Sequence, residues 1–150
     1  MGCLTARDER RRRNDAPILC ETPPAPDLDG LRSLWSEVGA SGLVQVAEQY
    51  ALMPSHASRL ALARNGAIGT VTSVQVSSTH LYHAVALMRA FLGARFEPAT
   101  VNARNFIAPL INPLVRDAWT DDDEPKEATT TIATIDFGGT MGLYDFMDLQ

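Results

Sequence analysis

His80 and His83 are the side chains in this sequence best suited to chemistry, because an imidazole gains or loses a proton close to neutral pH. They lie three residues apart in a segment, 79–92, whose pattern predicts a helix, so both point roughly the same way. His83 could orient a substrate or transfer a proton. The pair could instead ligate a metal, but that needs a third ligand such as His56 or Glu48, and nothing in the sequence holds either nearby. A structural role, with both rings packed near the start of the helix, is equally open.

Glu48 and Tyr50 are candidate ligand contacts, because they end a predicted strand, 43–50, where open sheets gather polar groups. Tyr82 and His80, at the start of the predicted helix, are two more. The alternative for Glu48 and Tyr50 is an ordinary strand end that faces solvent. We expect no metal at any of these residues.

Glu21-Thr22-Pro23 is a second polar group, placed between a predicted buried strand, 16–20, and a predicted helix, 28–38. A carboxylate close to a helix N-terminus is stabilised by the helix dipole even where it has no catalytic duty. The Thr22–Pro23 bond could be cis, as a small minority of X-Pro bonds are, and the sequence alone does not decide it.

The elements that position these residues follow from hydrophobic periodicity and turn residues. Helices are predicted at 28–38, 54–64 and 79–92. The first has an apolar stripe that predicts a core-facing side, formed by Leu28, Leu31, Leu34, Trp35 and Val38. Strands are predicted at 16–20, 43–50, 71–77, 100–105, 129–137 and 140–146. Helices between strands, followed by a terminal hairpin at Gly138-Gly139, predict an α+β fold with a mostly antiparallel mixed sheet and helices on one face.

Residues 106–128 are expected to be a surface loop with at most a short helix, because the segment holds three prolines, Pro109, Pro113 and Pro125. Its acidic run, residues 121–124, could bind a cation. It lacks the turn glycine and the later bidentate glutamate of a calcium loop, so a solvated loop is the favoured interpretation.

The order of these motifs resembles the C-terminal domain of the Gfo/Idh/MocA family, the NAD(P)-dependent sugar and inositol dehydrogenases. Residues 18–23 stand where the family has a strand and a Glu-Lys-Pro motif, 44–50 looks like its crossover strand, and 66–69 looks like its Gly-x-Ile-Gly turn. Counting back from the glycine that ends the next helix places His83 on the family histidine and Thr79 on the family aspartate. The resemblance covers roughly residues 16–150. It implies an oxidoreductase that uses NAD or NADP and a sugar-like small-molecule substrate.

Residue roles are implied by the same resemblance. The catalytic positions would be His83, Thr22 and Thr79. The substrate-binding positions would be His80, Tyr82, Glu48 and Tyr50. The cofactor-binding positions would be Glu21 and Pro23. The family lysine, however, is Thr22 here, and a threonine hydroxyl does not ionise near neutral pH. The Gly-x-Gly-x-x-Gly fingerprint of a dinucleotide fold is also absent. We therefore expect a substrate-side fragment that neither binds the cofactor nor oxidises a substrate by itself.

The composition limits the classes of partner that the chain can be expected to bind. The chain has 150 residues, 45% of them hydrophobic, and a net charge of −5, which argues against a general nucleic-acid binder. It has no apolar run of the roughly 18 residues that a membrane span needs. Two cysteines give no disulfide framework, so we expect a cytoplasmic protein.

Three segments are expected: an irregular arm at 1–15, a remnant Rossmann strand-helix unit at 16–42, and an incomplete Gfo/Idh/MocA-like domain at 43–150. The arginines of the arm could contact nucleic acid or a membrane, but interspersed acidic residues favour a solvated arm. Two other functions stay open. The chain could be a non-catalytic domain that self-assembles as a homo-oligomer through its sheet, as family members do, or a decayed gene fragment.

Overall fold

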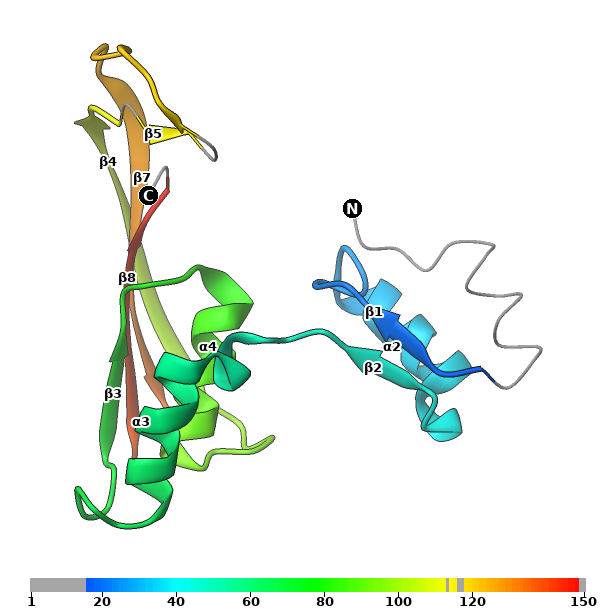
Figure 1. Cartoon of the computed structure of the whole chain (residues 1–150). Coiled ribbons are helices and arrows are strands. Elements are labelled where there is room, and N and C mark those ends of the chain that lie inside the picture. Colours follow the sequence, from blue (N-terminus) through cyan, green and yellow to red (C-terminus); the bar gives the residue numbers. More distant parts are fainter. Residues whose placement is uncertain (1–15, 113, 116–117, 149–150) are drawn as a thin grey trace. The chain divides into compact units, whose positions relative to one another are not determined.

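The structure is a computed structural model that describes residues 16–112, 114–115 and 118–148 (Figure 1). The chain divides into two compact units, Met1–Gln49 and Tyr50–Gln150. The expected arm at 1–15 lies outside the described residues.

The first unit contains a small strand-helix-strand motif. Strand β1 (Ile18–Cys20) pairs in parallel with β2 (Val44–Val46), and helix α2 (Leu28–Val38) and the short helix η1 (Gly39–Ser41) connect them. Asp27 caps α2, because its carboxylate accepts a hydrogen bond of 2.7 Å from the Gly30 amide. The predicted bounds of α2 are confirmed. Strand β2, expected to run from 43 to 50 and to open the second domain, is shorter and pairs with β1 instead, so the boundary follows Gln49 rather than residue 42.

The apolar stripe of α2 is not a core in this unit, contrary to the prediction. Val38 is buried, but Leu28 is 58% exposed and Trp35 is 73% exposed. The physical reason is the size of the neighbouring sheet: the part of this unit that the structure describes offers only the two short strands β1 and β2. Amphipathic spacing shows that one face of a helix is apolar, and it does not supply the surface that covers it.

The second unit is built on a four-stranded sheet in the order β3-β8-β7-β4. Strand β3 (Ser73–Val76) runs parallel to β8 (Met141–Met147), while β7 (Lys126–Asp136) is antiparallel to both β8 and β4 (Thr100–Leu110). The predicted hairpin at Gly138-Gly139 is confirmed, with both glycines at positive φ. With helices on one face of a mixed sheet, the chain has the expected α+β fold (Figure 1).

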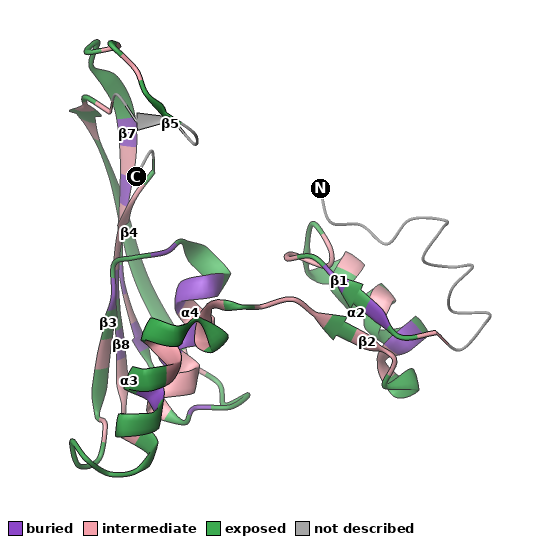
Figure 2. Ribbon diagram, viewed as in Figure 1, coloured by how far each residue is buried: buried purple, intermediate pink, exposed green. Residues whose placement is uncertain are grey.

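Two helices lie on one face of this sheet. Helix α3 (Pro54–Arg64) follows the short helix η2 (Tyr50–Leu52), and α4 (Leu81–Leu92) follows β3 and ends at Gly93, which has a φ of 69°. Leu87 and Met88 of α4 are almost fully buried against the sheet (Figure 2). The sheet contributes the rest of this core: Val76, Ala133, Ile135 and Tyr144.

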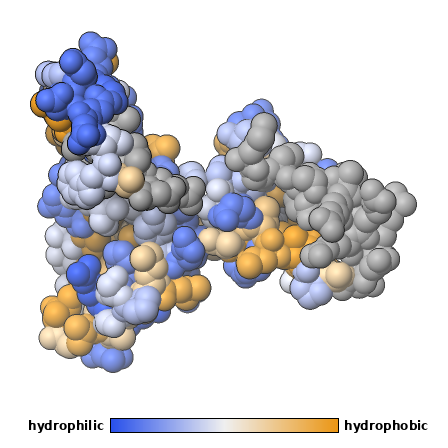
Figure 3. Space-filling model, turned by 45° about the horizontal axis from the view of Figure 1, so that its top comes forward, coloured by the Kyte–Doolittle hydropathy of each residue, from blue (hydrophilic) through white to orange (hydrophobic). Residues whose placement is uncertain are grey.

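The loop expected at 106–128 is largely strand. Strand β4 continues to Leu110, β5 (Leu114–Val115) pairs with β6 (Ala118–Trp119), and β7 begins at Lys126. Pro109 is tolerated because β4 is an edge strand, where a missing amide does not break a ladder. The acidic run, in which Asp121, Asp123 and Glu124 are exposed and Asp122 is half-buried, lies at the far end of the long strands, where Figure 3 shows hydrophilic side chains gathered. None of the described helices is long and apolar enough to cross a membrane.

Candidate functional site

Four of the predicted site residues meet at the start of α4. The His83 ring lies 4.5 Å from the Tyr50 ring and 4.3 Å from the Tyr82 ring, measured between centroids. The His80 ring meets it edge-on at 5.3 Å. His83 is 8% exposed, whereas His80 and Tyr82 are exposed. We call Tyr50, His80, Tyr82 and His83 the His/Tyr cluster.

The backbone at the start of α4 is unusual. The helix begins at Leu81 rather than at Thr79, and Leu81 has a φ of +43°, a left-handed conformation that is uncommon for a residue with a branched side chain. Its amide donates a hydrogen bond of 3.1 Å to the Tyr144 hydroxyl on β8. His80 is the N-cap residue, and its side chain makes no capping bond. The His80 and His83 rings, on either side of Leu81, meet at an interplanar angle of 89°.

Thr79 lies just before the cluster but is closed off from solvent. It is 2% exposed, and its hydroxyl has no hydrogen-bond partner among the described residues. Such a group carries a desolvation cost of about 1–3 kcal/mol. The position that the resemblance assigns to an aspartate thus holds a neutral, buried hydroxyl.

The remaining predicted residues belong to the first unit. The Glu21 carboxylate accepts hydrogen bonds from the Thr22 amide at 2.9 Å and from the Thr22 hydroxyl at 3.3 Å. The Thr22–Pro23 peptide bond is cis. Glu48 also lies in this unit. The predicted residues therefore form two sets, one in each unit, of which only the His/Tyr cluster is a packed group of rings.

The residues after β1 do not fit a dinucleotide. The connection from β1 to α2, residues 21–27, has no glycine that would let a pyrophosphate approach the backbone. The N-terminus of α2 is already occupied by the Asp27 carboxylate, and Asp29 adds a second negative charge in the first turn. Because a helix N-terminus binds phosphate through free amides and a positive field, these carboxylates oppose it.

Metal ligation has no support at the described positions, where no three His, Cys, Asp or Glu side chains are grouped to hold an ion. In the acidic run, Asp122 instead pairs with Lys126 at 2.5 Å. The hydrogen bond from Lys126, together with that from the Glu124 amide, lowers the pKa of Asp122.

Sequence reasoning missed two neighbours of the cluster. Tyr144 supplies the hydroxyl that holds the Leu81 amide, and the Phe146 ring lies 5.8 Å from the His80 ring. Both project from β8 at alternate positions on its helix-covered face, so the alternation of that strand was the available signal. No local sequence signal predicts the parallel pairing of β8 with β3, which brings these rings beneath α4.

A scan against protein-family models matches no family, and a search of curated proteins finds no similar one.

Proposed function

We propose that the second unit is the substrate-side part of an oxidoreductase of the Gfo/Idh/MocA type and binds a sugar-like polyol at the His/Tyr cluster. The observation that carries the proposal is the packing of two tyrosines and two histidines around the start of α4. Aromatic rings stack on the C–H faces of a sugar, while imidazole nitrogens and phenol hydroxyls exchange hydrogen bonds with its hydroxyl groups. His83 would orient the substrate hydroxyl.

By itself the chain would be inactive. Thr22 and Thr79 stand where the resemblance places lysine and aspartate, and neither hydroxyl replaces an ionisable acid or base. The carboxylates at the start of α2 oppose a dinucleotide phosphate there. NAD or NADP would have to be held by residues outside this strand-helix motif.

The proposal is tested by NMR titration with myo-inositol and with glucose. We expect the ring signals of His83 and Tyr82 to shift with a dissociation constant in the millimolar range. His83→Phe keeps a ring but removes both nitrogens, and should weaken binding at least tenfold without loss of the cooperative melt. Phe106→Leu, at an exposed ring on β4 outside the cluster, is the control.

Two results would overturn it. Titration shifts that survive in His83→Phe would place the ligand elsewhere. Oxidation of a polyol by the chain alone, followed through NADH or NADPH formation, would contradict its proposed dependence on a separate cofactor site.

A second candidate is self-assembly through the sheet face that the helices leave uncovered. Arg104, Ile132 and Asp145 form a row across β4, β7 and β8, because Ile132 pairs with both of the others. Ile132 is 49% exposed, and Asp145 accepts hydrogen bonds from Gln75 and Ser77 on the same face. A two-fold axis parallel to the strands would reverse the row, so that Arg104 of one copy faces Asp145 of the other.

Sedimentation velocity tests this assembly. We expect a dimer that dissociates in Ile132→Asp, since the substitution places a charge at the centre of the row. Ile107→Asp, at an exposed residue on the opposite face of β4, is the matched control. A monomeric wild-type protein at high concentration, or a dimer unaffected by Ile132→Asp, would refute this role.

A further inference from the structure

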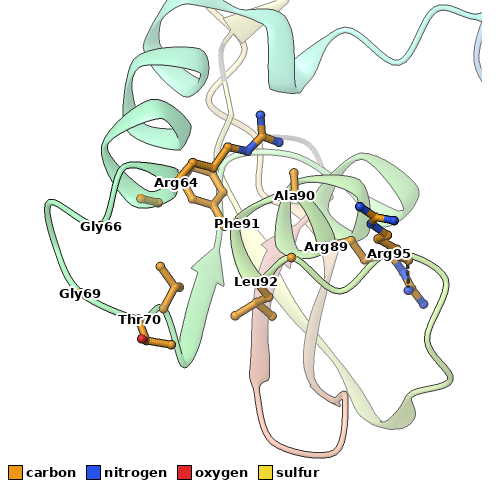
Figure 4. A pocket seen from close by; sticks show the side chains of 12 residues that line it. Arg64, Gly66, Gly69, Thr70, Arg89, Ala90, Phe91, Leu92 and Arg95 are labelled. Atoms are coloured by element: carbon orange, nitrogen blue, oxygen red, sulfur yellow. Dashed lines mark hydrogen bonds between the residues drawn. The ribbon is translucent and has the colours of Figure 1, made fainter.

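A groove runs beside α3 in the second unit. It consists of two adjoining hollows of about 910 and 520 Å³ that share Val71 and Phe91. Three residues of α3 at helical spacing, His56, Arg59 and Ala63, form one wall. Figure 4 shows the larger hollow between the turn at Gly66–Gly69 and the end of α4. We call the two hollows together the α3 groove.

The α3 groove is positively charged in a protein that is negative as a whole. The chain has 18 acidic and 13 basic residues, yet no aspartate or glutamate occurs among the described residues that line either hollow. The lining instead holds His56, Arg59, Arg64, Arg89 and Arg95. Arg89 is bonded to backbone carbonyls, which leaves the exposed guanidinium groups of Arg59, Arg64 and Arg95 to face a ligand. This segregation of charge favours an acidic partner.

The other wall of the smaller hollow is the edge strand of the sheet. It is lined by β3 along its whole length, and β3 pairs only with β8 among the described strands. The Thr72 carbonyl accepts a hydrogen bond from the Met141 amide, so it faces β8. Because alternate residues of a strand direct their backbone groups to opposite sides, Ser73 and Gln75 direct theirs outward into the groove. Unpaired edge groups of this kind are a template for another strand.

We propose that the α3 groove binds an extended acidic peptide segment of a partner protein, which adds a strand to β3. Its backbone would pair with Ser73 and Gln75. The peptide side chains that point to the helix-covered face are every second residue. Among these, apolar side chains would pack on Val74 and Phe91, and carboxylates would meet Arg59 and Arg64. Recognition of this kind takes affinity from main-chain hydrogen bonds and specificity from the side-chain contacts.

A peptide fits this groove better than a single-stranded nucleic acid. Single strands are held by several exposed aromatic rings on which the bases stack. Phe91 is the one Phe, Tyr or Trp in the described lining, and it is half-buried. The outward amides and carbonyls of β3 can both pair with a peptide backbone, whereas a phosphodiester chain has no donors for the carbonyls. The groove is not lined by His80, Tyr82 or His83, so peptide binding is independent of the proposed polyol site.

Fluorescence anisotropy with labelled eight-residue peptides tests the proposal. In the probe, valine and glutamate take turns at every second position with serine between them, so that both kinds of side chain point to the helix-covered face. Two control peptides carry either N-methyl groups on alternate amides or glutamine in place of glutamate. We expect the acidic probe to bind and both control peptides to lose at least tenfold in affinity. Arg59→Glu combined with Arg64→Glu should cause a loss of similar size. Arg32→Glu combined with Lys126→Glu, at exposed positions that line neither hollow, makes the same change in net charge and should leave the affinity unchanged.

Several outcomes would overturn the proposal. These are no binding at millimolar peptide, equal binding of the N-methylated or the neutral peptide, and equal losses in the Arg32→Glu, Lys126→Glu control and in the Arg59→Glu, Arg64→Glu variant. Tighter binding of an oligothymidine than of the acidic peptide would assign the groove to nucleic acid instead.

Discussion

The guanidinium carbon of Arg89 lies 4.9 Å from the centre of the Phe137 ring, which ties the end of α4 to the turn between β7 and β8. The same guanidinium donates hydrogen bonds to three backbone carbonyls in the chain that leaves α4, those of Ala94, Arg95 and Glu97, at 2.6–3.2 Å. A single side chain therefore connects the helix end, the following loop and the hairpin.

Arg89→Met should lower the free energy of unfolding by about 1–2 kcal/mol, because it removes a cation–π contact and charge-assisted hydrogen bonds, of which the one to the Ala94 carbonyl is partly buried and the others are exposed. Urea denaturation, followed by circular dichroism, measures this change in the free energy of unfolding. Phe137→Leu keeps the hydrogen bonds and should cost about 1 kcal/mol or less for the lost ring contact. An Arg89→Met variant as stable as the wild type would show that the carbonyls are equally well satisfied by water.

Gly142→Ala should destabilise the second unit by about 1–3 kcal/mol through overpacking. A Cβ at this position would lie 2.7 Å from the Met88 sulfur, in the best-packed part of the core. Met88→Ala alone should cost about 2–5 kcal/mol, because it leaves a cavity. If the clash is the cause, the double variant will be more stable than the sum of the two single effects predicts, and a strictly additive cycle would refute this explanation.

The sequence predicted elements best where a local signal marks both ends. Pro54 and Asn65-Gly66 bracket α3, and its bounds are as predicted. The prolines at 109, 113 and 125 predict a loop from residue 106, so the predicted strand ends at Asn105, whereas β4 continues to Leu110. What the sequence does not show is that β4 lies at the edge of the sheet, where proline is allowed.

Burial was harder to predict than secondary structure. The spacing of Leu28, Leu31 and Trp35 predicts a helix correctly, but burial depends on an opposing surface that is remote in sequence. The same limit applies to the candidate site. The spacing of His80 and His83 placed them together, whereas the contact of Tyr144 with Leu81 depends on the parallel pairing of β3 and β8, which no local pattern encodes.

Lys126→Met should raise the pKa of Asp122 toward its ordinary value, because the Lys126 hydrogen bond is the largest cause of the lowered pKa. Carboxyl-detected NMR titration measures the pKa directly. A carboxyl whose pKa is lower in the folded state stabilises the fold above its unfolded pKa, and this contribution is lost as the pH falls through the folded pKa. The pair is exposed to solvent, so the expected change in stability is small. A high salt concentration should also raise the pKa of Asp122 part of the way toward its ordinary value, because salt screens the pair. An unchanged pKa in Lys126→Met would show that Lys126 is not the cause of the lowered pKa.

Leu81→Gly should be more stable than Leu81→Ala by about 1 kcal/mol, because glycine adopts a positive φ without the steric cost that alanine carries. Leu81 is 60% exposed, so both variants lose a similar and small amount of packing. Tyr144→Phe removes the acceptor of the Leu81 amide and should cost about 0.5–1.5 kcal/mol. Thermal denaturation of the three variants separates the two effects. If alanine were as stable as glycine at position 81, the left-handed conformation would not be the one that the helix start holds in solution.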